Sequence, residues 1–307
     1  MVPSDFSGQR KTVSIVVPVF NRLEYTRRCI DALVQYPGDP PCELIVVDNA
    51  STDGTAAYLE QRGDTLVTVT LQENRGFACA CNQGAGVATG EYVLFLNNDT
   101  QVGPHWLSPL VATLEDDSVG LVGSRLVYPD GGIQHAGVIM VQRKDQGRLF
   151  FDHVFRHVDA QASCVLTPCE FQAVTGACFL VRRQEFSALQ GFDEAYWNGV
   201  EDIDFCLRLR EAGKRVVYQP ASLVVHDESQ SGAERFSGTD QNNQLFARKW
   251  RQKLVPDFIV AHDEVKVGPA GVVQGYGSDA ADVEGAIGFC AQVLPIGGTR
   301  FQTAPRA

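Results

Sequence analysis

Residues 92–100 read Tyr-Val-Leu-Phe-Leu-Asn-Asn-Asp-Thr, an apolar run that ends in two amides and a carboxylate. A short apolar run bounded by turn-forming residues is typical of a buried β-strand. In open α/β sheets, ligands bind beyond the carboxyl ends of the strands. Because oxygen ligands suit a divalent metal that holds a diphosphate, Asn97, Asn98 and Asp99 are candidate binding residues. The alternative is an ordinary turn, since Asn and Asp are common after strands.

Strand and helix patterns alternate on both sides of this stretch, from residue 13 to residue 115. This alternation predicts an α/β fold with a mostly parallel central sheet and helices on both faces. The expected strands are residues 13–19, 44–47, 66–71 and 92–96, and the expected helices are residues 22–35, 52–62, 77–88 and 104–115.

The pattern becomes irregular after a further expected strand at residues 119–127. Residues 128–168 mix Gly, His, Arg and aromatic residues with little period, which predicts a long functional loop with a short hairpin around residues 138–141. Regular patterns then return as strands at residues 171–174, 178–181, 216–218 and 223–225 and a helix at residues 201–212. The segment after Trp250 receives no assignment.

Composition and charge narrow the choice of function. The chain has 307 residues, 44% of them hydrophobic, which is enough for a sizeable core. Its net charge is -11 and it has no block of basic residues, which argues against a nucleic-acid partner. An acidic protein that handles an anionic diphosphate needs a local cation, and a divalent metal would meet that need.

Cysteine spacing and the N-terminal segment bear on the cellular compartment. The nine cysteines form no C-x-x-C pair, so neither a zinc site nor a disulfide framework is indicated. Residues 1–11 lack the apolar region of a signal peptide, and no run of 18 apolar residues occurs. We therefore expect a cytoplasmic protein, with peripheral contact at the inner face of the membrane left open.

Asp48 follows the expected strand at residues 44–47. A carboxylate at that position can accept the imide N–H of a pyrimidine base. The alternative is a local role, because the segment from Asp48 to Asp53 contains several residues that cap helices well.

His226 and Asp202 are two further candidates, far downstream. His226 directly follows the apolar run 223–225, and imidazole is a common ligand of Mn²⁺, so His226 can join Asp99 as a metal ligand. Asp202 lies in the first turn of the expected helix 201–212, off the apolar stripe, where it can project into a cleft as a general base. Carboxylates are also favoured there by the helix dipole alone, and a lone histidine is often structural.

Two other enzyme classes fit the sequence poorly. The glycine-rich run 84–90 falls late in a helix and before a strand, whereas a dinucleotide-binding fingerprint requires the strand first. No G-x-S-x-G element of a serine hydrolase is present.

Together, these segments resemble the family 2 glycosyltransferases, which have the GT-A fold. The similarity, with the segments in the same order, runs from about residue 13 to residue 250. It departs from the family at one position, because Asn97 replaces the first Asp of the metal-binding D-x-D motif. The segments that carry it are residues 16–21, 47–55, 73–78 with Asn82, 96–100, 176–178, 201–202 and His226.

The resemblance implies a role for each matching residue. Asp202 would be the general base, and Asp99, His226 and Asn97 would hold a divalent metal, Mn²⁺ or Mg²⁺. The nucleotide would contact Pro18, Phe20, Asp48, Asn49, Arg75, Asn98 and Asp99. The acceptor would contact Gly176, Ala177, Trp197 and Glu201.

The resemblance also implies the activity and the domain organisation. We expect an inverting transfer from a UDP- or dTDP-linked sugar to a glycan, a lipid-linked glycan or a protein. Residues 1–255 would form the GT-A domain, with a nucleotide-binding half at about 13–127 and an acceptor half with a smaller sheet at about 128–255. Residues 256–307 would form a tail. The alternative is an inactive nucleotide-sugar-binding homologue that acts as an assembly partner, which Asn97 favours.

Overall fold

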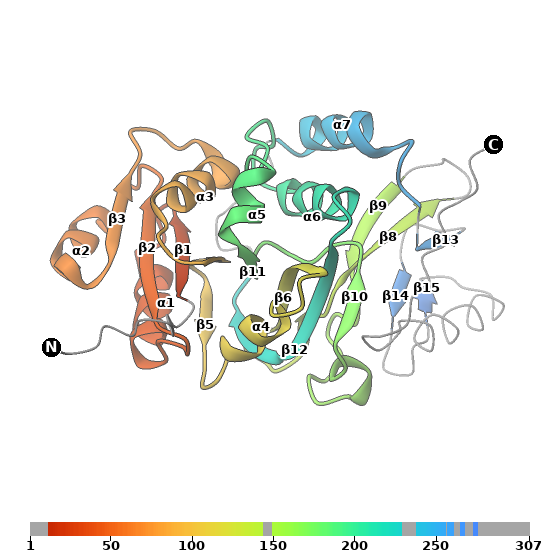
Figure 1. Cartoon of the computed structure of the whole chain (residues 1–307), viewed down its shortest axis with the longest axis horizontal. Helices are drawn as coiled ribbons and strands as arrows, with labels where there is room; N and C mark the ends of the chain where they lie inside the picture. The colour runs from red at the N-terminus through yellow and green to blue at the C-terminus, as the bar shows by residue number, and fades with distance from the viewer. Residues whose placement is uncertain are drawn as a thin grey trace, which may run out of the picture.

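The computed structural model describes residues 12–143, 149–228, 238–255, 257–260, 265–267 and 273–275. A central sheet with the strand order β10-β12-β6-β11-β4-β1-β2-β3 runs through the molecule, with β5 added to β12 and β7 added to β6 (Figure 1). The α/β expectation is confirmed. The strands of this sheet are β1 (Val13–Val19), β2 (Cys42–Asp48), β3 (Val67–Thr70), β4 (Tyr92–Leu96), β5 (Thr100–Val102), β6 (Val119–Val127), β7 (Ile133–His135), β10 (Cys169–Phe171), β11 (Cys178–Arg182) and β12 (Arg215–His226).

Helices cover both faces of the sheet. Alternate residues of a strand point to opposite faces, so Val16 of β1 and its neighbour Val17 belong to two different apolar clusters. The Val16 cluster includes side chains from α3, α5 and α6, and the Val17 cluster includes side chains from α1, α2 and α4. The helices are α1 (Leu23–Gln35), α2 (Thr55–Arg62), α3 (Gly76–Val87), α4 (Ser108–Thr113), α5 (Arg183–Ala188), α6 (Glu201–Glu211) and α7 (Thr239–Trp250).

The sheet is parallel from β3 through β2 and β1 to β4, as the alternating pattern predicts, and mixed beyond β4. There β11 lies between β4 and β6 and is antiparallel to both. β12 runs parallel to β6 and antiparallel to β5 and β10. The antiparallel β11 therefore joins the N-terminal half of the chain to the later half.

Several segments differ from the sequence-based expectation. The helix expected from residue 104 begins at Ser108, because His105 has a positive φ of 58° that a right-handed helix cannot include. The strands expected at 216–218 and 223–225 are one strand, β12, with an irregular register between Gln219 and Leu223. Pro220 lies in this irregular part, where a residue without a backbone N–H is tolerated.

Residues 128–168 are not one long loop, because they contain three strands, β7, β8 (Val138–Arg143) and β9 (Leu149–His153). β7 pairs with β6, and β8 pairs with β9 as an antiparallel hairpin, longer than the one expected around residues 138–141. β13 (Phe258–Val260) adds to β8 in parallel, which makes a smaller three-stranded sheet. Most of the expected tail, residues 256–307, lies outside the described residues, apart from β13 and a hairpin of β14 (Val265–Val267) and β15 (Val273–Gly275).

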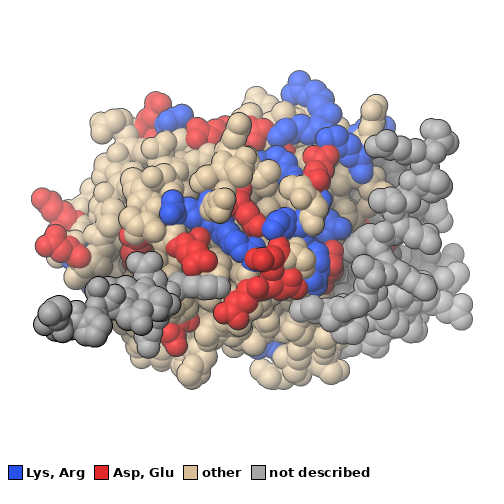
Figure 2. Space-filling view, in the orientation of Figure 1, with Lys and Arg blue, Asp and Glu red and all other residues tan. Residues whose placement is uncertain are grey.

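The surface carries mixed charges. On the face shown in Figure 2, Lys and Arg side chains lie beside Asp and Glu side chains. Ion pairs of the structure include Lys253–Glu211, at 2.7 Å, and Arg215–Asp116, at 3.2 Å. Among the residues that the structure describes, none of the helices has the length and apolar character needed to cross a bilayer.

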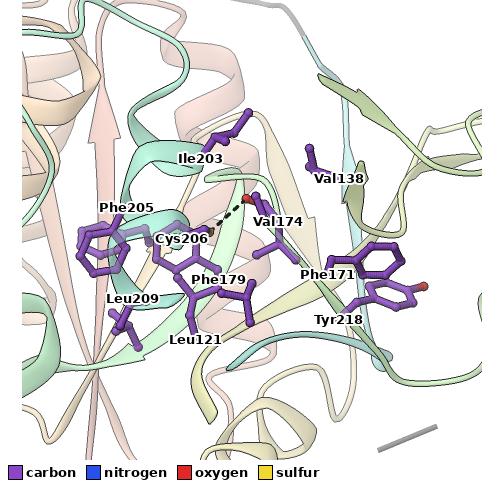
Figure 3. Close-up of a cluster of buried hydrophobic side chains, with 14 of the residues drawn as sticks. Leu121, Val138, Phe171, Val174, Phe179, Ile203, Phe205, Cys206, Leu209 and Tyr218 are labelled. Atoms are coloured by element: carbon purple, nitrogen blue, oxygen red, sulfur yellow. Dashed lines mark hydrogen bonds between the residues drawn. The ribbon is translucent and has the colours of Figure 1, made fainter. Parts of the chain in front are cut away.

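α6 packs on the sheet through fully buried side chains. Phe205 and Cys206 of this helix are 0% exposed, and they lie beside Phe179 of β11 and Val174 (Figure 3). The Cys206 thiol donates to the Val174 carbonyl oxygen at 3.8 Å. The N-terminal half of α6 is therefore anchored next to Val174, just before β11.

Candidate active site

A pocket of about 520 Å³ opens where β1, β2 and β4 end. Residues 18–20, 49 and 97–99 supply the wall at these strand ends. Residues 175–177 and 197–202, around the first turn of α6, supply a second wall, and residues from β7, β9 and the end of β12 supply a third. The pocket is lined by Pro18, Val19, Phe20, Arg22, Asn49, Asn74, Phe77, Asn97, Asn98, Asp99, Gln134, His153, Arg156, Thr175, Gly176, Ala177, Trp197, Asn198, Gly199, Val200, Glu201, Asp202, His226 and Glu228.

The pocket brings together all the site residues expected from the sequence except Asp48 and Arg75. The Arg75 guanidinium is half exposed and pairs with Glu194 at 3.2 Å, so its placement does not support the expected nucleotide contact. Asp48 is 1% exposed, and its Oδ1 accepts the Ser51 N–H at 2.9 Å. This is the local contact that the sequence left open as an alternative to base reading.

Asp99 and His226 meet because two short strands pair. β5 begins directly after Asp99 and runs antiparallel to β12, with Thr100 opposite His226. The pairing places Asp99 Oδ1 3.1 Å from His226 Nε2, and both residues are buried. Two candidates that are 127 positions apart in the sequence thus lie in direct contact.

The Asp99–His226 pair has a geometry that fits a divalent metal. Two ligands that bind one octahedral ion at about 2.1 Å lie about 3 Å apart, close to the separation found here. Within the described part of the chain, no group of three or more His, Cys, Asp or Glu side chains could hold a metal. An ion at this pair would therefore need further oxygen ligands, which the amide of Asn97, diphosphate oxygens and water can supply.

Asp202 lies in the first turn of α6 and faces the pocket. Its Oδ2 accepts the Gly176 N–H at 2.6 Å, and its Oδ1 accepts the Ile203 N–H at 2.8 Å. A Cβ atom at position 176 would lie 3.1 Å from the Asp202 Cβ, so a glycine there permits the close approach. The carboxylate is thereby held in place by the backbone at the start of β11.

The other carboxylates of this turn, Glu201 and Asp204, make hydrogen bonds within the protein. Glu201 is buried, and its Oε2 accepts the Gly199 N–H at 2.6 Å. Asp204 is 0% exposed and bonds to Arg208 at 2.8 Å, Lys249 at 2.9 Å and the Trp250 indole at 2.8 Å. Asp204 therefore joins α6 to α7 and has a structural role.

Trp197 lines the pocket from the turn before α6. Its ring lies against two glycines, since Cβ atoms at Gly76 and Gly238 would approach ring atoms to 3.3 Å and 3.2 Å. Its backbone N–H donates to Asn242 Oδ1 at 3.0 Å, and Asn242 Nδ2 donates to the Gly199 carbonyl oxygen at 2.9 Å. Asn242 belongs to α7, which therefore fixes this wall of the pocket, and the sequence pattern did not predict this helix.

The third wall is a hydrogen-bonded group that the sequence did not reveal. Glu228 Oε2 accepts from Arg156 at 2.9 Å and from the Tyr128 hydroxyl at 2.7 Å. Gln134 connects Glu228 to His226, and His153 lies beside it. Only the closeness of Glu228 to His226 in the sequence could have indicated this wall, because the other members belong to no motif.

Burial and hydrogen bonding set the charges of this wall. Burial raises the pKa of Glu228, but the Tyr128 hydrogen bond and the Arg156 charge outweigh it and hold that pKa below its usual value. Burial lowers the pKa of His153 to about 4, so the ring is neutral at neutral pH. The wall therefore presents one carboxylate, one guanidinium and neutral imidazole.

Known proteins resemble this chain in sequence. The profile of glycosyl transferase family 2 matches residues 14–183, more than half of the chain, and that of the N-terminal domain of galactosyltransferase matches residues 156–226. The O-antigen biosynthesis protein RfbC of Myxococcus xanthus is 36% identical over 222 residues, which are 71% of this chain and 17% of that protein. An N-acetylglucosaminyl-diphospho-decaprenol L-rhamnosyltransferase of Mycobacterium tuberculosis is 29% identical over 209 residues, 62% of this chain and 68% of that protein.

Solved structures share the fold. GalNAc-T7 with UDP, GalNAc and Mn²⁺ superposes with a TM-score of 0.62 at 18% identity, covering 79% of this chain and 48% of that one. The mannosyltransferase PcManGT of Pyrobaculum calidifontis, in complex with GDP-Man and Mn²⁺, has a TM-score of 0.58 at 23% identity, covering 80% and 66%. At these identities the likeness shows the fold alone, and that fold is GT-A. The profile match over more than half of the chain shows in addition that the chain belongs to glycosyl transferase family 2.

Proposed function

We propose that this chain transfers a sugar from a nucleotide-diphosphate donor to a hydroxyl of a glycan, lipid-linked glycan or protein, with inversion at the anomeric carbon. The observation that supports this most is one pocket with the Asp99–His226 pair and the Asp202 carboxylate both in its walls. Backbone contacts join the two groups: the Asn97 N–H donates to the Ala177 carbonyl at 2.9 Å, and the adjacent Gly176 N–H donates to Asp202.

The residues would divide the work as follows. Asp99 and His226, with the Asn97 amide, would hold a Mn²⁺ or Mg²⁺ ion, which when bound supplies Lewis-acid neutralisation of charge on the leaving diphosphate. Asp202 would accept the proton of the acceptor hydroxyl while that oxygen bonds to the anomeric carbon and the bond from this carbon to the diphosphate breaks. General base catalysis of this kind contributes about 10²- to 10⁴-fold in rate.

The named relatives guide the choice of donor and acceptor. The mycobacterial relative is named as an L-rhamnosyltransferase that acts on a diphospho-decaprenol-linked sugar, and the solved GT-A structures hold UDP or GDP-Man. We propose a UDP- or dTDP-linked donor whose pyrimidine base is read near Asp48, and an acceptor that is a glycan or carries one. Peripheral membrane contact would bring a lipid-linked acceptor to the pocket.

The test replaces Asp202 by Asn, which keeps the shape of the side chain but cannot take the proton. Product formation with a panel of UDP-, dTDP- and GDP-sugars and lipid-linked or free glycan acceptors should fall about 10²- to 10⁴-fold in kcat. Donor affinity, measured by calorimetry with Mn²⁺, should stay near the wild-type value.

Glu201→Gln is the neighbouring control. Its side chain holds the Gly199 N–H, so its effect should be on acceptor KM or stability, with a smaller loss of kcat. Wild-type turnover by Asp202→Asn would exclude Asp202 as the base. Donor binding by the wild type without product from any donor and acceptor would favour the inactive nucleotide-sugar-binding homologue.

A further inference from the structure

Gln134 lies in β7, is 1% exposed, and stands between the third wall and the Asp99–His226 pair. Its Oε1 is 3.3 Å from His226 Nδ1. Its Nε2 is 3.4 Å from Glu228 Oε1 and 3.2 Å from His153 Nδ1. A single buried amide thus contacts three titratable side chains, of which His226 is a candidate metal ligand.

Glu228 dictates which way the Gln134 amide faces. The carboxylate accepts hydrogen bonds from Arg156 and Tyr128, so it is an ionised acceptor with no proton to donate. The group of Gln134 that faces Glu228 must therefore be the NH₂ end. The carbonyl end consequently faces His226, and it can only accept.

The amide in turn fixes the protons of His226. Because Gln134 Oε1 is an acceptor, His226 Nδ1 must carry the hydrogen that bonds to it. In the neutral ring, Nε2 then presents a lone pair toward Asp99 Oδ1 at 3.1 Å. Two acceptors that face each other at this distance need a positive charge between them, either a proton or a metal ion.

We propose that Gln134 is a positioning residue that holds His226 in the Nδ1–H form, so that its Nε2 lone pair is ready to bind the metal together with Asp99. The inference rests on the metal-dependent function proposed above. Partners that orient a metal-binding imidazole through its second nitrogen change metal affinity by about 10- to 100-fold when they are lost. Gln134 would act through His226, without touching the substrate.

The test titrates Mn²⁺ into metal-free protein with saturating UDP or dTDP and counts free Mn²⁺ by electron paramagnetic resonance. Gln134→Leu removes the acceptor for His226 Nδ1 at similar volume, and it should weaken Mn²⁺ binding about 10- to 100-fold. Nucleotide affinity without metal should not change. Equal Mn²⁺ affinity in the wild type and Gln134→Leu would overturn the assignment.

Gln172→Leu is the matched control, because Gln172 is also buried but bonds to Asp257 and the Val255 carbonyl outside the pocket. Its Mn²⁺ affinity should equal that of the wild type. An equal loss in Gln172→Leu and Gln134→Leu would mean a general loss of structure and would overturn the specific role.

Glu228→Gln keeps the test decisive if Gln134→Leu does not fold. A neutral amide at position 228 no longer forces the orientation of Gln134, so Mn²⁺ should bind more weakly than in the wild type, with a smaller loss than in Gln134→Leu. The double variant should lose no more than Gln134→Leu alone, because both changes act through one amide. Unchanged Mn²⁺ affinity in Glu228→Gln, or additive losses in the double variant, would overturn the role of Glu228 and Gln134 in orienting His226.

The wild type distinguishes this inference from the proposed function. If the wild type binds no Mn²⁺ with either nucleotide, the metal site of the proposed function fails. If the wild type binds Mn²⁺ and the variants match it, only this inference fails.

Discussion

At the residue scale, Asp48 has one observed contact and one proposed role, the reading of the donor base. Its Oδ1 accepts the Ser51 N–H, and a base-reading role would use its remaining acceptor capacity. Asp48→Asn can keep the Ser51 contact through its own carbonyl oxygen, but it presents an NH₂ group where an imide N–H needs an acceptor. Since an unsatisfied buried donor costs about 1–3 kcal/mol, we expect the KM for a uridine or thymidine donor to rise about tenfold or more.

Asp53→Asn is the control for this prediction. Asp53 accepts from the Leu23 N–H at 2.9 Å and from the Thr55 hydroxyl at 2.6 Å, so it holds the same segment without facing a base. It should change the free energy of unfolding and leave the preference among nucleotides intact. An unchanged nucleotide preference in Asp48→Asn would leave Asp48 with the turn contact alone.

The sequence alone pointed to Asp99, His226 and Asp202, which the structure places in one pocket, but not to the side chains around them. Asp99 and His226 adjoin strand ends and Asp202 begins a helix, so pattern and position together mark them. Gln134, His153 and Arg156 lie in a stretch whose strands are interrupted by turns, and its mixed composition resembles a loop. Their meeting depends on which strands pair, which no local pattern encodes.

At the element scale, α7 acts as a brace for the pocket. Asn242 is 2% exposed and bonds to both Trp197 and Gly199, and Lys249 and Trp250 of the same helix bond to Asp204 of α6. Asn242→Ala removes both contacts to the turn before α6. We expect it to lower the free energy of unfolding by about 1–3 kcal/mol and to raise the acceptor KM, because Trp197 loses its support.

Asn243→Ala is a matched control on the same helix, because Asn243 is exposed. Urea unfolding and acceptor titrations at saturating donor would measure both variants. Equal unfolding free energies and equal acceptor KM values in Asn242→Ala and Asn243→Ala would contradict the support of the pocket by α7. Of these two residues, Asn242 is the one that contacts the pocket wall.

Helices and strands could be predicted from the sequence where the apolar pattern was strong, and the others could not. β1 and β4 have the expected bounds because continuous apolar residues mark strands buried on both faces. β5 has only three residues, and it exists because it pairs with β12. α7 has few buried positions, so its apolar pattern was too weak to detect.

At the scale of the whole molecule, the pocket depends on joining the two halves of the chain. β11 lies between β4 and β6, so the Asn97 loop and the Gly176–Asp202 contact come together at one sheet edge. The sequence supports the α/β class and the parallel half. The mixed half required long-range antiparallel pairings, which the alternating pattern does not specify.

His135 lies at this junction and links the stability of the whole molecule to pH. It is 0% exposed, its Nδ1–H donates to the Ser124 carbonyl at 3.2 Å, and its Nε2 accepts the Thr175 N–H at 3.2 Å. Both nitrogens are therefore used by the neutral ring. Burial holds the pKa of His135 well below 6.5.

This burial predicts a loss of stability in mild acid. Below pH 6.5 the unfolded chain protonates His135 and the folded chain does not, so the free energy of unfolding falls as pH falls, down to the folded pKa. The loss is about 1.4 kcal/mol per pH unit for one proton, and above pH 6.5 it disappears.

His135→Gln tests this, because it can keep both hydrogen bonds without a titrating group. Urea unfolding between pH 7.5 and 5.0 should show a slope of the free energy of unfolding against pH that is smaller by about one proton. His105→Gln, at an exposed histidine, should keep the wild-type slope. Equal slopes for His135→Gln and the wild type would mean that the folded protein protonates His135 as readily as the unfolded chain, which would contradict the neutral ring between Ser124 and Thr175.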